Sequence, residues 1–482
     1  MEEKSSNIIS NVAWKFAERI LAQLVSLVVS VILARILLPE DYGAISMVMV
    51  FITIANVFVT DGIPTALIQK KEADELDFSS VFHFNLGVSI IIYVILYCAA
   101  PAIAQFYKTP ILSPVIRVLG IRLIVASVNS VQHAYVSRNM IFKKYFWSTL
   151  FGTLFSGVVG IIMAYKGYGV WALVAQYMTN TTVDTIVLFI TVHWRPTLQF
   201  QFCRIKGLLK FGWRILFEGV SNAISGQIRN LVIGRVYTSS DLAFYSKGQQ
   251  FPSLIVTNVS ASIGSVLFPA IANEQDDKVK VLAILRKAIR TSTYVIYPIL
   301  FGLAAIAPAF VSCLLTDKWD RTIPYLQIYC FMYMSTVALI PRHQALNGCG
   351  RSDIFMREHI LSRVISFILL IATYRISVMA IAISGIVSTI VLILIVAFTS
   401  KKYTGYSYRD QLFDILPTVI GCMVMAIPVY LINYLMIGNG IKLIIQILLG
   451  TAIYLSYSIL FKLEEFTICK QYAGGIISKF KK

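Results

Sequence analysis

The sequence predicts an all-α, polytopic membrane protein with about 14 transmembrane helices. Of its 482 residues, 57% are hydrophobic and only 14% are charged, and the mean hydropathy is +0.74. Long apolar runs recur along the chain and are separated by short polar connections. Such a composition excludes an ordinary soluble domain.

The apolar runs place the helices along the chain. We expect them at approximately 12–36, 42–68, 79–105, 113–136, 146–165, 168–192, 208–235, 241–271, 290–315, 322–346, 353–374, 377–400, 412–435 and 441–461. Residues 204–210 are expected to form a surface linker. Residues 276–290 are expected to form a separate amphipathic helix on the membrane surface, because their apolar side chains share one stripe.

The first two helices carry charges at bilayer depth, namely Glu18, Arg19 and Asp61. An ionised group there costs at least a few kcal/mol, so such a helix faces a protein or water-lined interior. The alternative for Arg19 is a side chain that reaches back to the membrane surface. Pro64 cannot donate to the carbonyl of Thr60, which predicts a bend beside Asp61.

This hairpin recurs two hundred residues later. The shift aligns Glu18 with Glu218, Arg35 with Arg235, Asp41 with Asp241 and Ser46 with Ser246. Internal repeats are common in transporters, and six intervening helices place both copies in the same direction across the membrane. We therefore expect two pseudo-repeated halves related by an axis along the membrane normal.

The distribution of positive charge predicts the orientation. The chain has a net charge of +18, and most of its 42 lysines and arginines lie at the amino end, in alternate connections and in the tail after residue 462. The opposite connections hold only Arg35, Lys108, Lys166, Arg235, Lys318, Arg321, Arg375 and Lys442. Both termini are therefore expected to be cytoplasmic. This distribution favours a membrane protein over a nucleic-acid binder.

Neither a metal site nor a cleaved signal is predicted. The 7 cysteines are scattered without CxxC or Cys/His spacing. The start Met1-Glu2-Glu3-Lys4 lacks a basic segment, so the first apolar run is expected to remain as a helix.

Buried positive charge exceeds buried negative charge within the helices. The candidate anion-binding residues are Arg19, Arg122, Arg214, Arg229, Lys247 and Arg363. The candidate ion-coupling or gating residues are Glu18, Asp61, Asp184 and Glu218. Arginine presents a fork that matches phosphate oxygens, so an excess of buried cations favours an anionic cargo. For Arg214 and Glu218, an intrahelical ion pair is the alternative.

Amides on the same helices offer donors and acceptors together, which suits sugar hydroxyls. The candidate glycan-contacting residues are Asn129, Gln132, Asn222 and Asn258. The alternative role for each amide is a hydrogen bond between helices.

Several motifs resemble a known family. They are Ala34-Arg35-Ile36-Leu37-Leu38-Pro39-Glu40-Asp41-Tyr42-Gly43, Asp61-Gly62-Ile63-Pro64-Thr65-Ala66-Leu67-Ile68-Gln69, Gln132 with Arg138 and Phe142, and Gly167-Tyr168-Gly169-Val170-Trp171-Ala172-Leu173. Together they are similar to the Wzx-type polysaccharide transporters, the oligosaccharide flippases of the MOP superfamily.

The resemblance implies two six-helix lobes around a central cavity plus two C-terminal helices. The corresponding parts are 1–200, 201–405 and 406–462, followed by a basic cytoplasmic tail at 463–482. It also implies that undecaprenyl-pyrophosphate-linked oligosaccharide crosses the bacterial inner membrane by alternating access, without enzymatic chemistry and with polysaccharide polymerase or assembly proteins as partners. No cofactor is expected, and a gradient of H⁺ or Na⁺, or the membrane potential, would supply the drive.

Three other functions compete with this one. A multidrug exporter of the same superfamily generally carries cations, which surplus arginine would repel. A flippase for a lipid-linked peptidoglycan precursor carries the same kind of anion and stays open. A membrane glycan polymerase or ligase generally needs a large outer loop, and every outer connection here is short. The sequence does not identify the glycan, the coupling ion or the oligomeric state.

Overall fold

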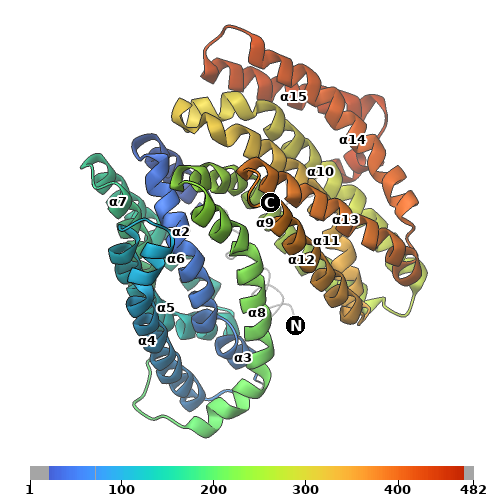
Figure 1. Cartoon of the computed structure of the whole chain (residues 1–482). Helices are drawn as coiled ribbons and strands as arrows, with labels where there is room; N and C mark the ends of the chain where they lie inside the picture. Colours follow the sequence, from blue (N-terminus) through green and yellow to red (C-terminus); the bar gives the residue numbers. More distant parts are fainter. Residues whose placement is uncertain (1–20, 71, 472–482) are drawn as a thin grey trace, which may run out of the picture. The chain divides into compact units, whose positions relative to one another are not determined.

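A computed structural model describes residues 21–70 and 72–471, except for the side chains of 211 and 398–404 (Figure 1). The described chain is helical and contains no strand. After the described part of the first helix, Leu21–Ile36, the helices are α2 (Pro39–Thr60), α3 (Ile63–Gln69), α4 (Glu75–Phe106), α5 (Leu112–Arg138), α6 (Phe142–Tyr165), α7 (Val170–Thr191), α8 (Phe202–Val236), α9 (Ser239–Asn273), α10 (Lys278–Leu314), η1 (Asp317–Thr322), α11 (Ile323–Gly348), α12 (Ser352–Thr373), α13 (Val378–Thr404), α14 (Tyr408–Leu431), η2 (Ile432–Tyr434) and α15 (Asn439–Leu460).

Ten segments in the described chain are long and apolar enough to cross a bilayer. Each corresponds to one of the expected spans, so the polytopic all-α prediction is confirmed, while the count of 14 is not reproduced. The expected first span is described only from Leu21. The other three are α7, α8 and α12, whose apolar stretches are interrupted by polar or charged residues such as Asp184, Arg229 and Glu358.

Two predictions about connections are wrong. Residues 278–290 begin the long helix α10, and 204–210 lie in the first turns of α8. Val279, in the first turn of this segment, is 77% exposed, whereas other apolar residues of the segment are buried. Its residues Val281, Leu285 and Ile289 are buried against Ile271 of α9 and Ala345 of α11. The first turns of α10 are polar on one side, but packing of their apolar side against neighbouring helices stabilises them as part of the helix.

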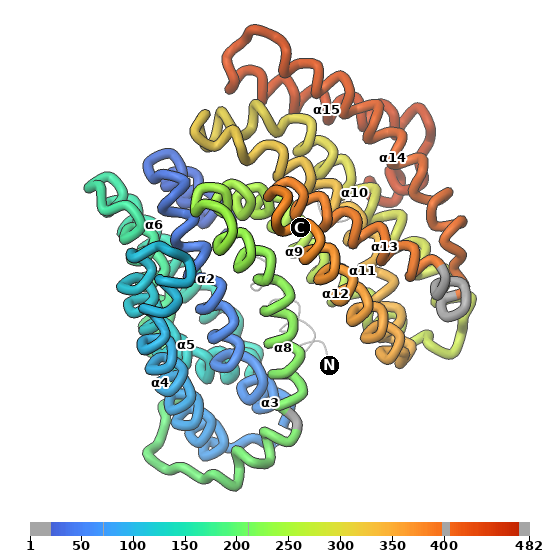
Figure 2. Tube along the Cα trace, viewed as in Figure 1, coloured from blue at the N-terminus to red at the C-terminus, as the bar shows by residue number. Residues whose placement is uncertain are grey.

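The chain divides into two compact units, residues 1–243 and 244–482, and the division falls in the first turn of α9. In unit 1, α8 packs against α2, α3 and α4, and α7 packs against α5 and α6. Figure 2 shows α8 running beside α2 and α3. In unit 2, α10 packs against α11, α14 and α15, and α13 against α11 and α12.

The helix starts agree with the proposed repeat. α2 begins at Pro39 and α9 at Ser239, and in each case an aspartate three residues after the cap accepts from the cap N–H. The distances are 3.2 Å from Leu38 N to Asp41 Oδ2 and 3.4 Å from Thr238 N to Asp241 Oδ2. The copies then differ, because α2 ends at Thr60 whereas α9 continues to Asn273.

These two helix starts also touch each other. A Cβ atom on Gly43 would lie 1.9 Å from the carbonyl oxygen of Ser239 and 2.3 Å from its carbonyl carbon. Beside this contact, the Ser240 hydroxyl donates to Glu40 Oε1 at 2.6 Å. Only glycine allows the two backbones to approach so closely.

Candidate functional site

The contact between α5 and α7 in unit 1 positions Arg122. Its Nε donates to Thr181 Oγ1 at 2.7 Å, and its guanidinium carbon lies 5.6 Å from the centre of the Tyr177 ring. The side chain is half-buried. One hydrogen bond and one ring thus hold the plane of the guanidinium, and its two terminal nitrogens receive no partner from the described residues.

A second polar layer follows on the same pair of helices. Asp184 Oδ2 accepts from Asn129 Nδ2 at 2.5 Å and lies 3.2 Å from His133 Nε2. Asn129 is 4% exposed, and the side chains of His133 and Asp184 are 24% and 16% exposed. We call Arg122, Asn129, His133, Thr181 and Asp184 the α5–α7 cluster.

Helical spacing explains how α5 contributes three members of this cluster. Arg122, Asn129 and His133 are separated by seven and four residues, which places them on one face of the helix. On α7, Asp184 follows Thr181 by almost one turn. Helix α6 supports α7 closely, since a Cβ on Gly152 would lie 3.0 Å from the Asn180 carbonyl oxygen.

The predicted bend beside Asp61 is confirmed. α2 ends at Thr60, Gly62 has φ +70°, and α3 starts at Ile63 with Pro64 in its first turn. The half-buried Asp61 carboxylate accepts from the Thr60 hydroxyl at 3.2 Å. A Cβ on Gly219 would lie 2.9 Å from Asp61 Oδ2, so this carboxylate faces α8 and not the α5–α7 cluster.

Other predicted residues of α8 lie apart from the cluster. Arg214, Glu218 and Asn222 are exposed, and Arg229 is half-buried. Arg214 and Glu218 form no ion pair with each other, and the Arg214 guanidinium lies 5.8 Å from the ring of Trp213. Glu18 and Arg19 lie outside the described residues.

The remaining predicted residues have separate surroundings. In α5, the Gln132 side chain is buried and donates to the Trp194 carbonyl at 3.3 Å, so it links α5 to the segment after α7. In unit 2, Lys247 is 4% exposed with its ammonium 5.9 Å from the Trp319 ring centre. Asn258 donates to Leu254 of its own helix at 2.8 Å, and Arg363 is half-buried on α12.

The sequence did not single out a buried ion pair in unit 2. Arg342 lies inside α11 and is fully buried. Its Nη1 and Nη2 donate to Glu358 Oε2 and Oε1 of α12 at 2.6 and 2.8 Å. A bidentate pair of this kind joins the two helices of the hairpin.

A cavity of about 380 Å³ lies among α9, α10, α14 and α15 of unit 2. Its lining is apolar apart from Thr451, Tyr454 and Gln446, whose Nε2 donates to the Val429 carbonyl and to Asn433 Oδ1 at 3.0 Å each. None of the predicted cations lines this cavity.

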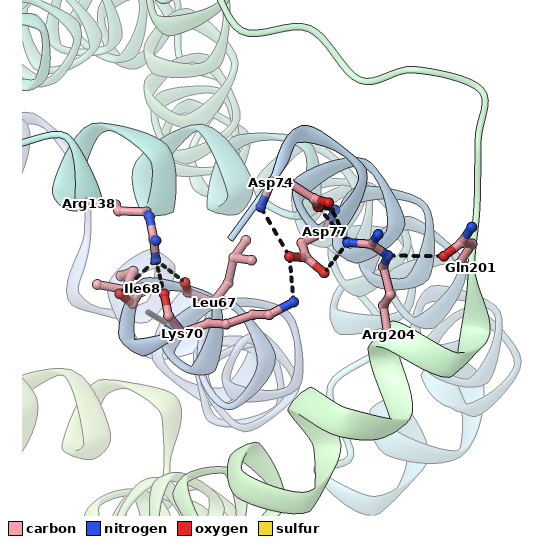
Figure 3. Close-up of polar contacts among 8 residues, drawn as sticks. All are labelled: Leu67, Ile68, Lys70, Asp74, Asp77, Arg138, Gln201 and Arg204. Atoms are coloured by element: carbon pink, nitrogen blue, oxygen red, sulfur yellow. Dashed lines mark hydrogen bonds and ion pairs between the residues drawn. The ribbon is translucent and has the colours of Figure 1, made fainter. Parts of the chain in front are cut away.

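A network of charged residues joins α8 to the start of α4 (Figure 3). Arg204 Nη1 donates to Asp74 Oδ1 at 2.6 Å and to Asp77 Oδ1 at 3.1 Å, while Lys70 Nζ lies 2.5 Å from Asp77 Oδ2. Gln201 accepts from Arg204 Nε at 3.0 Å. These contacts hold the first turn of α8 against the start of α4.

We expect this network to give unit 1 an acid-sensitive stability. Burial alone would raise the pKa of Asp74, but the Asp77 backbone N–H and the Arg204 guanidinium outweigh burial and hold this pKa below 3.8. Its stabilisation is therefore fully present above about pH 4 and is lost as the pH falls through the lowered pKa. Arg204→Ala should lower the melting temperature in detergent at neutral pH and should flatten its decline in acid. An acid decline identical to that of the wild type would contradict this role.

Comparison with known proteins identifies the family. A family model described as "Polysaccharide biosynthesis protein" matches residues 32–324, which is more than half of the chain. The chain belongs to this family. The predicted membership among polysaccharide transporters is thus confirmed.

Three relatives from the family's biosynthetic systems are similar over most of the chain. They are the succinoglycan biosynthesis transport protein ExoT of Rhizobium meliloti (strain 1021), 25% identical over 67% of this chain and 65% of ExoT; the lipopolysaccharide biosynthesis protein WzxC of Escherichia coli (strain K12), 23% identical over 73% of this chain and 72% of WzxC; and the teichuronic acid biosynthesis protein TuaB of Bacillus subtilis (strain 168), 24% identical over 62% of each. The chain spans slightly less than two thirds of ExoT and TuaB.

Two solved structures have a similar fold. The lipid II flippase MurJ in an inward closed conformation has a TM-score of 0.75 and 16% identity, covering 94% of this chain and 98% of MurJ. An inward-facing multidrug resistance MATE family transporter has a TM-score of 0.60 and 15% identity, covering 81% of this chain and 96% of that transporter. The family member described here is therefore a multi-pass membrane protein whose fold is like that of MurJ and of the MATE transporter.

His133 and Thr181 are the members of the α5–α7 cluster that sequence reasoning did not assign to the site. The signal for His133 was available, since it follows Asn129 by four residues on the face that carries Arg122. Thr181 has no comparable signal, because only the packing of α7 against α5 brings it to Arg122.

Proposed function

We propose that this protein flips an undecaprenyl-pyrophosphate-linked oligosaccharide from the cytoplasmic to the outer leaflet of the bacterial inner membrane, for assembly of a surface polysaccharide. The observation that carries this proposal is Arg122, a half-buried cation held by Thr181 and Tyr177 on an apolar helix. The relatives ExoT, WzxC and TuaB, which are named for polysaccharide biosynthesis, support the cargo class.

The pyrophosphate is the part of the cargo that Arg122 suits. A guanidinium fixed through Nε presents its terminal N–H groups as a fork, which matches two oxygens of one phosphate. Because the side chain is half-buried, the contact is stronger than it would be in water. Arg19, Arg214, Arg229, Lys247 and Arg363 would receive the same anion at other stages, and Asn129, Gln132, Asn222 and Asn258 would contact the glycan.

Alternating access is the movement that we infer. The lobes 1–200 and 201–405 would rock about the cargo, with 406–462 as an appendage and both termini in the cytoplasm, where the basic tail at 463–482 would face anionic lipid. The break at Asp61 and Gly62 supplies a hinge beside α8. Glu18, Asp61, Asp184 and Glu218 are the candidates for coupling to an H⁺ or Na⁺ gradient, and polymerase or assembly proteins would receive the product.

The test is a strain that lacks this gene and is complemented with variants. The deletion strain should accumulate lipid-linked repeat units on the cytoplasmic side, and the wild-type gene should restore export. Arg122→Ala should reduce export roughly tenfold or more, because a hydrogen bond to a charged group is worth about 1.5–3 kcal/mol. Arg122→Lys should retain part of the export.

Arg375→Ala is the matched control, because it removes an exposed cation from a connection outside the cluster. It should leave export unchanged. Full export by Arg122→Ala, at a protein level equal to that of the wild type, would contradict the proposed function. Accumulation of a peptidoglycan precursor instead of repeat units would favour the competing lipid-linked cargo.

A further inference from the structure

The layer around Asp184 contains polar atoms that the rest of the described chain leaves without a partner. They are Asn129 Oδ1, His133 Nδ1 and Asp184 Oδ1, and each is buried. A buried polar atom without a hydrogen bond costs about 1–3 kcal/mol, so a cluster of three calls for an explanation. Water or a mobile ion would supply the missing partners.

The helices packed against α7 carry further charged and titratable groups. They are Arg117, Arg122, His133, Tyr135 and Arg138 of α5, Lys143, Lys144, Tyr145 and Tyr165 of α6, and Glu40, Asp41 and Tyr42 of α2, with Tyr177 on α7 itself. Lys144 donates to the Thr191 carbonyl, and Asp41 caps its own helix. The Tyr145 ring packs against the imidazole of His133 at an interplanar angle of 50°, with centroids 4.3 Å apart. Among the described residues, His133 is the one cationic group within ion-pair distance of Asp184.

We propose that His133 and Asp184 together bind one proton, and that this proton strengthens the binding of a pyrophosphate head group at Arg122. The inference rests on the proposed function and deepens it, because it names the coupling ion and links its site to the cargo site. Protonation converts the neutral imidazole next to the carboxylate into an imidazolium, using a proton from water and no other reactant. Both side chains are partly exposed, so water can deliver that proton.

The geometry favours a proton over a metal cation. Alkali and alkaline-earth ions prefer several oxygen ligands, whereas Asp184 Oδ2 is already occupied by the Asn129 amide nitrogen and by His133 Nε2. In the described chain, Asp184 Oδ1 and Asn129 Oδ1 remain without hydrogen-bond partners within 3.5 Å, and the Ser148 hydroxyl of α6 lies beside the Asp184 carboxylate. An imidazole, in contrast, changes charge within the physiological pH range.

The sign of the coupling follows from Coulomb's law. With His133 neutral, the charges of Asp184 and Arg122 cancel, and protonation leaves one net positive charge on the cluster. Thr181, which accepts from Arg122, and Asp184, which contacts His133, are three residues apart on α7, or slightly less than one turn. An anion at Arg122 and a proton at the histidine therefore stabilise each other. Linkage requires that the anion raises proton affinity by the factor by which the proton raises anion affinity.

The experiment measures the binding of farnesyl pyrophosphate to the purified full chain by calorimetry. The ligand itself also ionises between pH 6 and pH 8, so the change in affinity measured with Asp184→Asn is subtracted from that of the wild type. After this correction, we expect the wild type to bind about tenfold more tightly near pH 6 than near pH 8. The number of protons taken up on binding is measured by repeating the titration in buffers with different ionisation enthalpies. We expect this number to be higher in the wild type than in Asp184→Asn, by up to one proton per ligand.

Two variants separate the possible outcomes. Asp184→Asn removes the negative charge permanently, so it should bind tightly at both pH values. His133→Gln retains an amide donor toward Oδ2 and should bind without the additional proton uptake. Asp353→Asn alters an exposed carboxylate of α12 that lies outside the cluster, and it should behave as the wild type.

Absence of binding by the wild type at every pH would overturn the proposed function together with this inference. Binding with equal proton uptake in the wild type and in His133→Gln would overturn the inference alone. Binding that depends on Na⁺ at constant pH would also overturn it, because a sodium ion would then occupy the layer.

Discussion

Gly43→Ala is expected to destabilise the protein more than any other single methyl group added to unit 1. The new Cβ would lie 1.9 Å from the Ser239 carbonyl oxygen and 2.8 Å from its Cα, so no side-chain rotation can relieve the clash. The start of α2 and the start of α9 would have to separate. Overpacking typically costs 1–3 kcal/mol, and this backbone clash is expected to cost about 3 kcal/mol or more.

Thermal unfolding in detergent measures this effect, and Gly87→Ala is the matched control. Gly87 lies inside α4, and a Cβ there would meet nothing within 4 Å. Alanine has the higher helix propensity, so the control should melt at the wild-type temperature or slightly above it. Equal melting of Gly43→Ala and Gly87→Ala would contradict the close approach of the two helix starts.

Arg342→Met is expected to have the second large effect. The substitution would leave the Glu358 carboxylate buried, at 3% exposure, without its bidentate partner. Removing one partner of a buried ion pair costs about 3–5 kcal/mol, because the remaining charge stays uncompensated. The melting temperature of the variant in detergent should therefore fall by several degrees.

The double variant Arg342→Met/Glu358→Leu tests that explanation. Replacing a whole buried pair with apolar residues of similar volume is often neutral or stabilising, so the double variant should recover most of the lost stability. A double variant as unstable as Arg342→Met would show that altered packing, and not the uncompensated Glu358 carboxylate, causes the loss of stability.

The helices could be predicted from the sequence wherever a local feature, such as a long apolar run or a proline, determines where a helix lies or ends. Ten bilayer-length segments follow the apolar runs, and the break at Asp61 follows from Gly62 and Pro64. The starts of α8 and α10 could not be predicted in this way. Their first turns are polar, and they become helical because one face is buried against neighbours that are distant in sequence.

The residues of the candidate site could also be predicted only in part. Arg122, Asn129 and Asp184 could be selected because charges and amides are rare in apolar helices. Their mutual arrangement depends on the packing of α7 against α5, which is a long-range contact. Arg342 was not selected, because its partner Glu358 comes from the next helix, α12, and the sequence alone does not show that the two side chains meet.

A flipping assay with the purified protein in proteoliposomes tests most directly whether buried cations bind an anionic cargo. Proteoliposomes would contain the full chain with either a polyprenyl-pyrophosphate-linked oligosaccharide or a neutral polyprenyl-linked analogue with the same glycan. We expect the wild type to flip the anionic lipid at least roughly tenfold faster than the neutral one, and Arg122→Ala to lose this preference. Equal rates for both lipids in the wild type, or an unchanged preference in Arg122→Ala, would contradict a role for Arg122 as the receptor of the pyrophosphate.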